Sequence, residues 1–120
     1  MGARGNIRID FNDGGHTYFY GHWSGSEMFN ILRDALQRGR PRWDDEPYLA
    51  RIIFCELVKN DLAGLTGYGI SPYLCDNEYK IFTVNSEKKT VGMVTERGES
   101  LNEWSFEEFI ALSADPRSGG

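Results

Sequence analysis

The chain has 120 residues, a length that favours a single domain able to bury its own core without disulfides or metal ions. Hydrophobic residues make up 40% and charged residues 26%, which are ordinary values for a globular protein. Thirteen basic and eighteen acidic residues give a net charge of −5, which argues against general nucleic-acid binding because that needs a positive surface.

The cysteine usage and the apolar stretches indicate the compartment. Cys55 and Cys75 have no CxxC partner, so the sequence predicts neither a zinc site nor any other cofactor. The N-terminus lacks an apolar signal region, and no apolar stretch approaches membrane-spanning length. We therefore expect a cytoplasmic protein with reduced thiols and no membrane contact.

The first half of the chain predicts a β-hairpin followed by two helices. Strand-like alternation on either side of an Asn-Asp-Gly-Gly turn indicates the hairpin. Apolar residues at helical spacing, with capping residues before them and Gly39 and Pro41 between them, indicate the helices. The predicted elements cover residues 6–11, 17–20, 28–36 and 44–60.

The second half predicts three strands and a short C-terminal helix, over residues 70–74, 79–84, 90–95 and 104–112. Asp76-Asn77-Glu78 is interpreted as a hairpin turn, and tight turns favour antiparallel pairing. We therefore predict an α+β fold with an antiparallel sheet in the order ββ-αα-βββ-α and the helices packed on one face. The domain is expected to cover residues 1–113, with a flexible tail over 114–120.

The strand-to-helix junction over residues 20–26 is the first candidate site. Free amides at a helix start can receive an anion, two glycines allow close approach, and an indole can stack on a planar ring. The candidate ligand-binding residues here are Tyr20, His22, Trp23, Ser24 and Ser26. The alternative is a capped helix with Trp23 in the core and His22 on the surface.

Two further segments can contribute to a ligand site. Arg42 and Trp43 precede the second helix and offer charge and stacking. The alternative is that the acidic residues there only complement the helix dipole. Tyr68, between two glycines, can line a pocket or lie on the core. No metal site is predicted, because three consecutive acids at a helix start do not converge on one point. No nucleophile-elbow sequence accompanies the two histidines, so no catalytic residue is assigned.

The chain resembles a family of small uncharacterised proteins of tailed bacteriophages and prophages, over about residues 7–110. The motifs that carry this likeness are Tyr18-x-Tyr20-x-His22-Trp23-x-Gly25-Ser26, Arg42-Trp43-x-Asp45, Tyr48-Leu49-x-Arg51-Ile52-Ile53-Phe54, Thr66-Gly67-Tyr68-Gly69-Ile70 and Asp76-Asn77-Glu78. The family has no assigned activity. Small phage proteins outside the virion often counter host defence, and some sequester nucleotide signals in pockets completed across an oligomer interface.

The resemblance and the three segments together lead to one favoured expectation. The protein would bind a nucleotide-type signalling molecule without catalysis, as a possible homo-oligomer in the host cytoplasm. The first segment would form one wall, Arg42, Trp43 and Arg51 would add charge and stacking, and Tyr68 would cover the base or ribose. Two alternatives stay open: a protein-interaction module that inhibits a host defence enzyme, and a small nucleotide hydrolase with His22 as acid or base.

Overall fold

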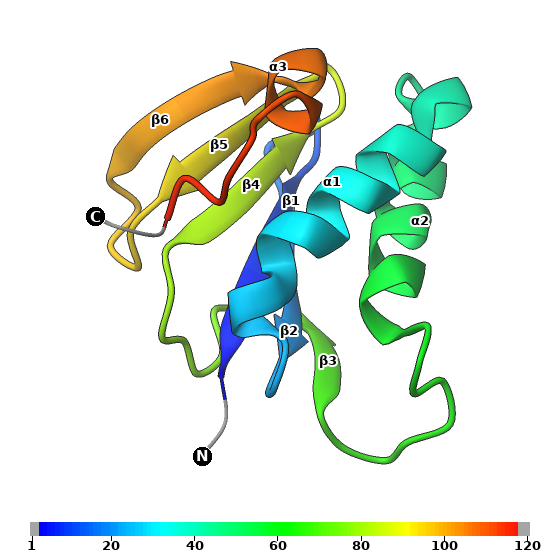
Figure 1. The fold of residues 1–120 in the computed structure, drawn as a ribbon, viewed down its shortest axis with the longest axis vertical. Helices are drawn as coiled ribbons and strands as arrows, with labels where there is room; N and C mark the ends of the chain where they lie inside the picture. The colour runs from blue at the N-terminus through cyan, green and yellow to red at the C-terminus, as the bar shows by residue number, and fades with distance from the viewer. Residues whose placement is uncertain (1–2, 118–120) are drawn as a thin grey trace.

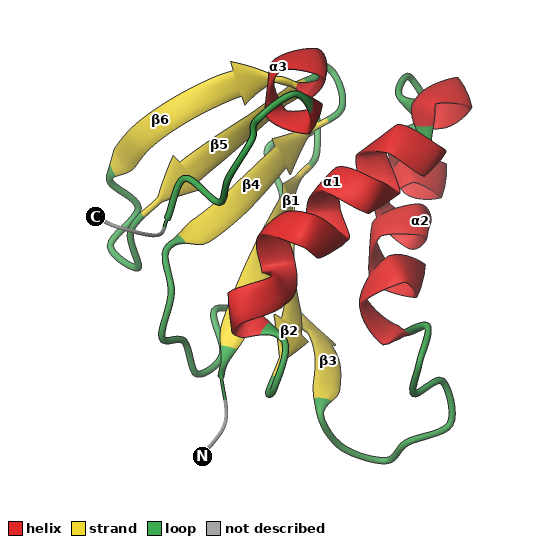
Figure 2. Cartoon of the chain, in the orientation of Figure 1, coloured by secondary structure: helices red, strands yellow, loops and turns green. Residues whose placement is uncertain are grey.

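The structure, a computed structural model, describes residues 3–117 and shows a six-stranded sheet with the α-helices on one face (Figures 1 and 2). The predicted α+β class is confirmed. In chain order the elements are β1 (Gly5–Asp10), β2 (His16–Gly21), the short 3-10 helix η1 (Gly25–Glu27), α1 (Met28–Arg38), the 3-10 helix η2 (Arg40–Arg42), α2 (Glu46–Val58), β3 (Tyr68–Ser71), β4 (Ile81–Asn85), β5 (Thr90–Val94), β6 (Ser100–Ser105) and α3 (Phe106–Ile110).

The sheet is mixed, so the predicted all-antiparallel arrangement is wrong. Its order is β3-β2-β1-β4-β5-β6, and β1 runs parallel to β4, with Ile7 opposite Phe82. The chain does not turn back on itself after β3. Residues 72–80 instead cross to the far side of β1, so that β4 enters in the same direction as β1. Asp76-Asn77-Glu78 belongs to this crossover and is not a hairpin turn.

The structure contains a strand that the sequence pattern did not predict. Strand β6 pairs antiparallel with β5, with a register shift between Met93 and Val94. Trp104 lies on β6 opposite Val91 and does not belong to the C-terminal helix. That helix is otherwise confirmed as α3, and Ser105 forms a reciprocal capping box with Glu108 at its start. The element order is therefore ββ-αα-ββββ-α.

The core lies between the sheet and the helices. Alternation along β1 and β4 turns Ile7, Ile9, Phe82 and Val84 towards the helices, where all four are buried. Helix α1 contributes an apolar stripe, and Phe29 on it meets the ring of Phe109 of α3 at 5.3 Å between centroids. This packing fixes the position of α1 against β1 and of α3 against the opposite half of the sheet.

The end of the described chain also packs against the body of the protein. Arg117 lies within the predicted tail, yet only 4% of its side chain is exposed. Its guanidinium lies over the rings of Phe82 and Tyr79, pairs with Asp115 and donates to the carbonyl oxygen of Gly25 at 3.0 Å. Residues 118–120 of the predicted tail lie outside the described residues.

Candidate functional site

The structure brings the first candidate segment and Tyr68 together where β2 ends beside β3. Tyr20 Oη and His22 Nδ1 are hydrogen-bonded at 2.8 Å, and the His22 ring meets the Trp23 ring edge-on at 5.0 Å. Ser24 Oγ lies 3.3 Å from Tyr68 Oη and hydrogen-bonds to it. We name the group Tyr20, His22, Trp23, Ser24 and Tyr68 the aromatic cluster.

The backbone of Gly67 fixes the position of Trp23. The amide of His22 donates to the carbonyl of Gly67 at 2.8 Å, which extends the β2–β3 ladder by one pair. Gly67 has a φ of +101°, and a Cβ added to it would collide with the six-membered part of the Trp23 ring. The indole therefore rests directly on a glycine, while Trp23 remains 55% exposed. This tryptophan is neither core nor a loosely held surface side chain.

Charged and buried polar groups border the aromatic cluster on the side of β1. Arg4 pairs with Glu78 at 2.9 Å and with Asp76 at 3.6 Å. The hydrogen bonds that Arg4 donates to Glu78 lower the pKa of Glu78. Burial raises the pKa of Tyr20, with Asp76 adding to the effect. The Oδ1 atom of Asn6, a residue opposite Tyr20 in the sheet, is buried and has no hydrogen-bond partner among residues 3–117.

The helix start expected to receive phosphate is covered. The amide of Gly25 already donates to the carbonyl of Ala3 at 2.6 Å, and a Cβ added to Gly25 would meet that carbonyl and the Tyr79 ring. Ser26 lies apart from the aromatic cluster, beside a small cavity of about 170 Å³ lined also by Tyr79, Asp115 and Arg117. A phosphate near Trp23 would therefore have to be received by side chains.

Arg42, Trp43 and Arg51 are not brought to the aromatic cluster. Arg42 and Trp43 follow α1, an 11-residue helix that separates them from Trp23 by about 16 Å along its axis. Trp43 donates from Nε1 to the carbonyl of Leu36 at 2.8 Å and packs against the ring of Phe106. Arg51 is exposed on α2 and makes no hydrogen bond or ion pair with residues 3–117. The expected single pocket is thus divided between two regions.

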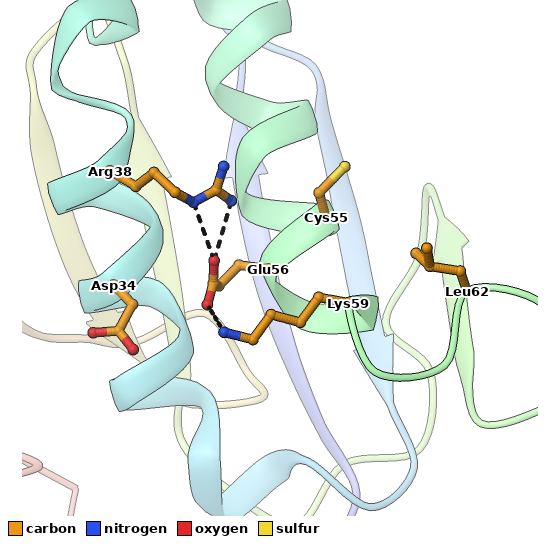
Figure 3. A pocket seen from close by; sticks show the side chains of 6 residues that line it. All are labelled: Asp34, Arg38, Cys55, Glu56, Lys59 and Leu62. Atoms are coloured by element: carbon orange, nitrogen blue, oxygen red, sulfur yellow. Dashed lines mark hydrogen bonds and ion pairs between the residues drawn. The ribbon is translucent and has the colours of Figure 1, made fainter.

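Sequence reasoning missed a cavity of about 640 Å³ between α1 and α2, lined by Asp34, Arg38, Cys55, Glu56, Lys59 and Leu62 (Figure 3). Glu56 is 7% exposed, and both of its oxygens are engaged, by Arg38 at 3.1 Å and by Lys59 at 2.6 Å. Burial opposes ionisation of Glu56, but the bonds from Lys59 and Arg38 outweigh it and lower its pKa. The spacing of Glu56 and Lys59 on one helix was the only available signal, and it is a common feature of solvated helices.

The arrangement of Arg38, Glu56 and Lys59 is a clamp between two helices. Its two cations converge on one carboxylate, so neither is left as an unpaired charge for a ligand. Among residues 3–117 no group of three or more His, Cys, Asp or Glu side chains is placed to hold a metal ion. No helix in the same range is long and apolar enough to cross a membrane.

Comparison with protein-family models, with curated proteins and with solved structures gives no match. The function therefore has to be inferred from the side chains and their surroundings. The aromatic cluster is the strongest candidate site among these regions, because it combines an exposed ring on a fixed support with several hydrogen-bonding groups.

Proposed function

We propose that the protein binds a nucleotide-type ligand without transforming it, with the planar base of the ligand stacked on Trp23. The observation that carries this proposal is the seating of a 55% exposed indole on the backbone of Gly67. The resemblance to phage proteins extends the proposal to a counter-defence role, in which the bound molecule is a signal of the host.

Stacking supplies the main part of the binding free energy in this proposal. An aromatic side chain contributes about 1–3 kcal/mol per stacked base. Because Gly67 already holds the Trp23 ring in place, little conformational entropy is lost when the ligand binds. The cluster also contains the hydroxyls of Tyr20, Ser24 and Tyr68, which are groups able to bond a sugar or the edge of a base. By strand alternation Tyr20 lies on the face of the sheet away from the helices and Tyr68 on the helix side.

The charges nearby favour a ligand with little negative charge. Arg4 lies close enough to Tyr20 to oppose the rise in its pKa, and it is already paired with Glu78 and Asp76. A triphosphate would approach these two carboxylates with several charges and would be repelled. A nucleoside, or a cyclic nucleotide with one phosphodiester charge per base, avoids most of this cost. We therefore expect weaker binding of ATP than of a cyclic dinucleotide.

The bonding of the cluster supports binding over catalysis. Ser24 is bonded to Tyr68 and not to His22, so no histidine is placed to remove its proton. The Nδ1 atom of His22 is bonded to a tyrosine, and Glu78 is paired with Arg4. Among residues 3–117 no serine, threonine or cysteine is hydrogen-bonded to His22, so the cluster offers no ready nucleophile–base pair.

The test is native mass spectrometry of the protein incubated with adenosine, a cyclic dinucleotide, ADP-ribose or ATP. We expect retention of an unaltered small molecule, and its loss in Trp23→Ala and in Gly67→Ala, where the added Cβ displaces the indole. Tyr48→Ala is the matched control, because Tyr48 is 53% exposed and lies on α2, away from the cluster. Absence of binding to all four compounds would refute the proposal, and release of an altered mass would indicate an enzyme instead.

A further inference from the structure

The two edge strands of the sheet differ in how their outward backbone groups are satisfied. The terminal strands are β3 and β6. In an antiparallel pair, alternate residues bond to the neighbouring strand, and the residues between them direct their N–H and C=O groups away from it. The bond from the His22 amide to the Gly67 carbonyl sets this alternation for β3. It follows that Tyr68 and Ile70 present their backbone groups at the open edge.

The other edge is closed by the protein's own side chains. The bond from the Phe106 amide to the Lys89 carbonyl sets the alternation on β6, so the outward residues there are Glu103 and Ser105. The Glu103 amide donates to Asn102 Oδ1 at 2.8 Å, and the Ser105 amide donates to Glu108 Oε1 at 2.7 Å. Side-chain partners of this kind block the addition of another strand.

The amides of Tyr68 and Ile70, in contrast, have no hydrogen-bond partner among residues 3–117. In Figure 1 strand β3 lies at the outer side of the sheet, with β2 as its neighbour on the inner side. The edge is short because Pro72, which has no N–H, follows the strand directly. It therefore offers the backbone groups of a three-residue stretch.

The charge distribution indicates which partner can occupy this edge. Residues 62–75 contain no charged side chain, in a chain with 26% charged residues and a net charge of −5. Large apolar side chains in this stretch are exposed, namely Leu62, Leu65, Ile70 and Tyr73. Two copies of an acidic protein repel each other over most of their surface. This uncharged stretch is where they can approach without that repulsion.

We propose that two copies of the chain associate through antiparallel pairing of β3 with β3, with the twofold axis at Gly69. In this register Tyr68 of one copy lies opposite Ile70 of the other, and each such pair exchanges two backbone hydrogen bonds. Gly69 then faces Gly69 of the second copy as the closely spaced, non-bonded pair, where the absence of a side chain removes any clash. A Cβ added to Gly69 would meet nothing within 4 Å, so the space over this position is open.

The same register also matches the side chains. Ile70 is opposite Phe19 and Tyr68 is opposite Gly21 in the β2–β3 ladder, so both point to the helix side of the sheet. Each tyrosine therefore packs beside an isoleucine of the second copy, an aromatic–β-branched pair that stabilises cross-strand contacts. The two sheets join into one continuous sheet. This inference depends on the edge geometry and not on the proposed ligand.

Sedimentation velocity and light scattering over a concentration series, without ligand, test this pairing. We expect a concentration-dependent dimer that dissociates in Ile70→Lys, through charge repulsion at the axis, and in Ile70→Pro, which removes an outward N–H without affecting a bond to β2. Each variant is expected to weaken association at least tenfold. For Ile70→Pro, this is the order of effect expected from losing two intermolecular hydrogen bonds, one from each copy. Leu101→Lys on β6 is the matched control and should dimerise normally, because Leu101 is 45% exposed on the closed edge.

Hydrogen exchange identifies the interface directly. The Tyr68 amide should exchange quickly in the monomer and slowly in the dimer, whereas the Glu103 amide should be unaffected by association. A protein that stays monomeric into the high micromolar range would overturn the proposal, including a monomer that instead binds another protein at this edge. A dimer that persists in both Ile70 variants, or one without protection of Tyr68, would overturn it equally.

Discussion

Trp23→Ala provides the sharpest check on the description of the aromatic cluster, because the two interpretations of Trp23 predict different losses of stability. A tryptophan can bury up to about 250 Å². Trp23 is 55% exposed, so roughly 110 Å² of that area is covered. At about 25 cal/mol per Å², reduced for compactness of the unfolded chain, its removal should cost about 2 kcal/mol.

Trp43→Ala is the comparison within the same chain. Trp43 is half-buried, donates from Nε1 to the Leu36 carbonyl and packs edge-on against Phe106 at 5.1 Å between ring centroids. Removing it leaves a cavity at the end of α1 and an unsatisfied carbonyl, for which we expect a loss of about 3–5 kcal/mol. The two tryptophans should therefore differ by at least about 1 kcal/mol, roughly a factor of 5 in the unfolding equilibrium.

The assay is urea unfolding followed by far-ultraviolet circular dichroism, with the midpoints compared at a common slope. Far-ultraviolet spectra of the folded Trp23→Ala protein should match the wild type. If Trp23→Ala is destabilised as much as Trp43→Ala, or loses native secondary structure, then Trp23 is part of the core and the stacking surface described here does not exist.

Three further predictions concern groups outside the aromatic cluster. The pKa of Glu56 is lowered in the folded protein, so its ionisation stabilises the fold above the unfolded pKa of 4.5, and this stabilisation is lost as the pH falls through the folded pKa. In Glu56→Gln, the free energy of unfolding measured in urea should therefore depend less on pH below about 4.5 than it does in the wild type. Arg117→Ala should cost about 3 kcal/mol in the same assay at pH 7, because it breaks a buried ion pair, and a loss below 0.5 kcal/mol would contradict the packing of residue 117. Gly25→Ala should lower the melting temperature, because the new Cβ would lie 2.5 Å from the Ala3 carbonyl oxygen, whereas Gly69→Ala, which meets nothing, should change it far less.

Part of the candidate site was predictable from the sequence. Tyr20, His22, Trp23 and Ser24 are adjacent along the chain, so their proximity needs no tertiary information. The participation of Tyr68 was also expected, and the bond from the His22 amide to Gly67 places it there. The predicted grouping of these residues with Arg42 and Trp43 is not observed, because helix α1 lies between the two segments. A sequence motif carries no information about which end of a helix faces which strand.

Local chemistry determined the elements that the sequence could establish alone. Apolar residues at helical spacing defined α1 and α2, a Ser105–Glu108 capping box defined the start of α3, and the Asn-Asp-Gly-Gly turn closed the β1–β2 hairpin. Each of these depends on atoms only a few residues apart. The sequence alone therefore determined the α+β class and most of the helices and strands.

Only the tertiary structure decided the parallel pairing of β1 with β4, the clamp on Glu56 and the difference between the two sheet edges. Strand pairing depends on the path of a connection such as residues 72–80, and periodicity within a strand says nothing about that path. An outward amide is open or closed according to which side chain lies beside it in space. The sequence defined most of the elements, and long-range packing defined which of their polar groups remain available to a partner.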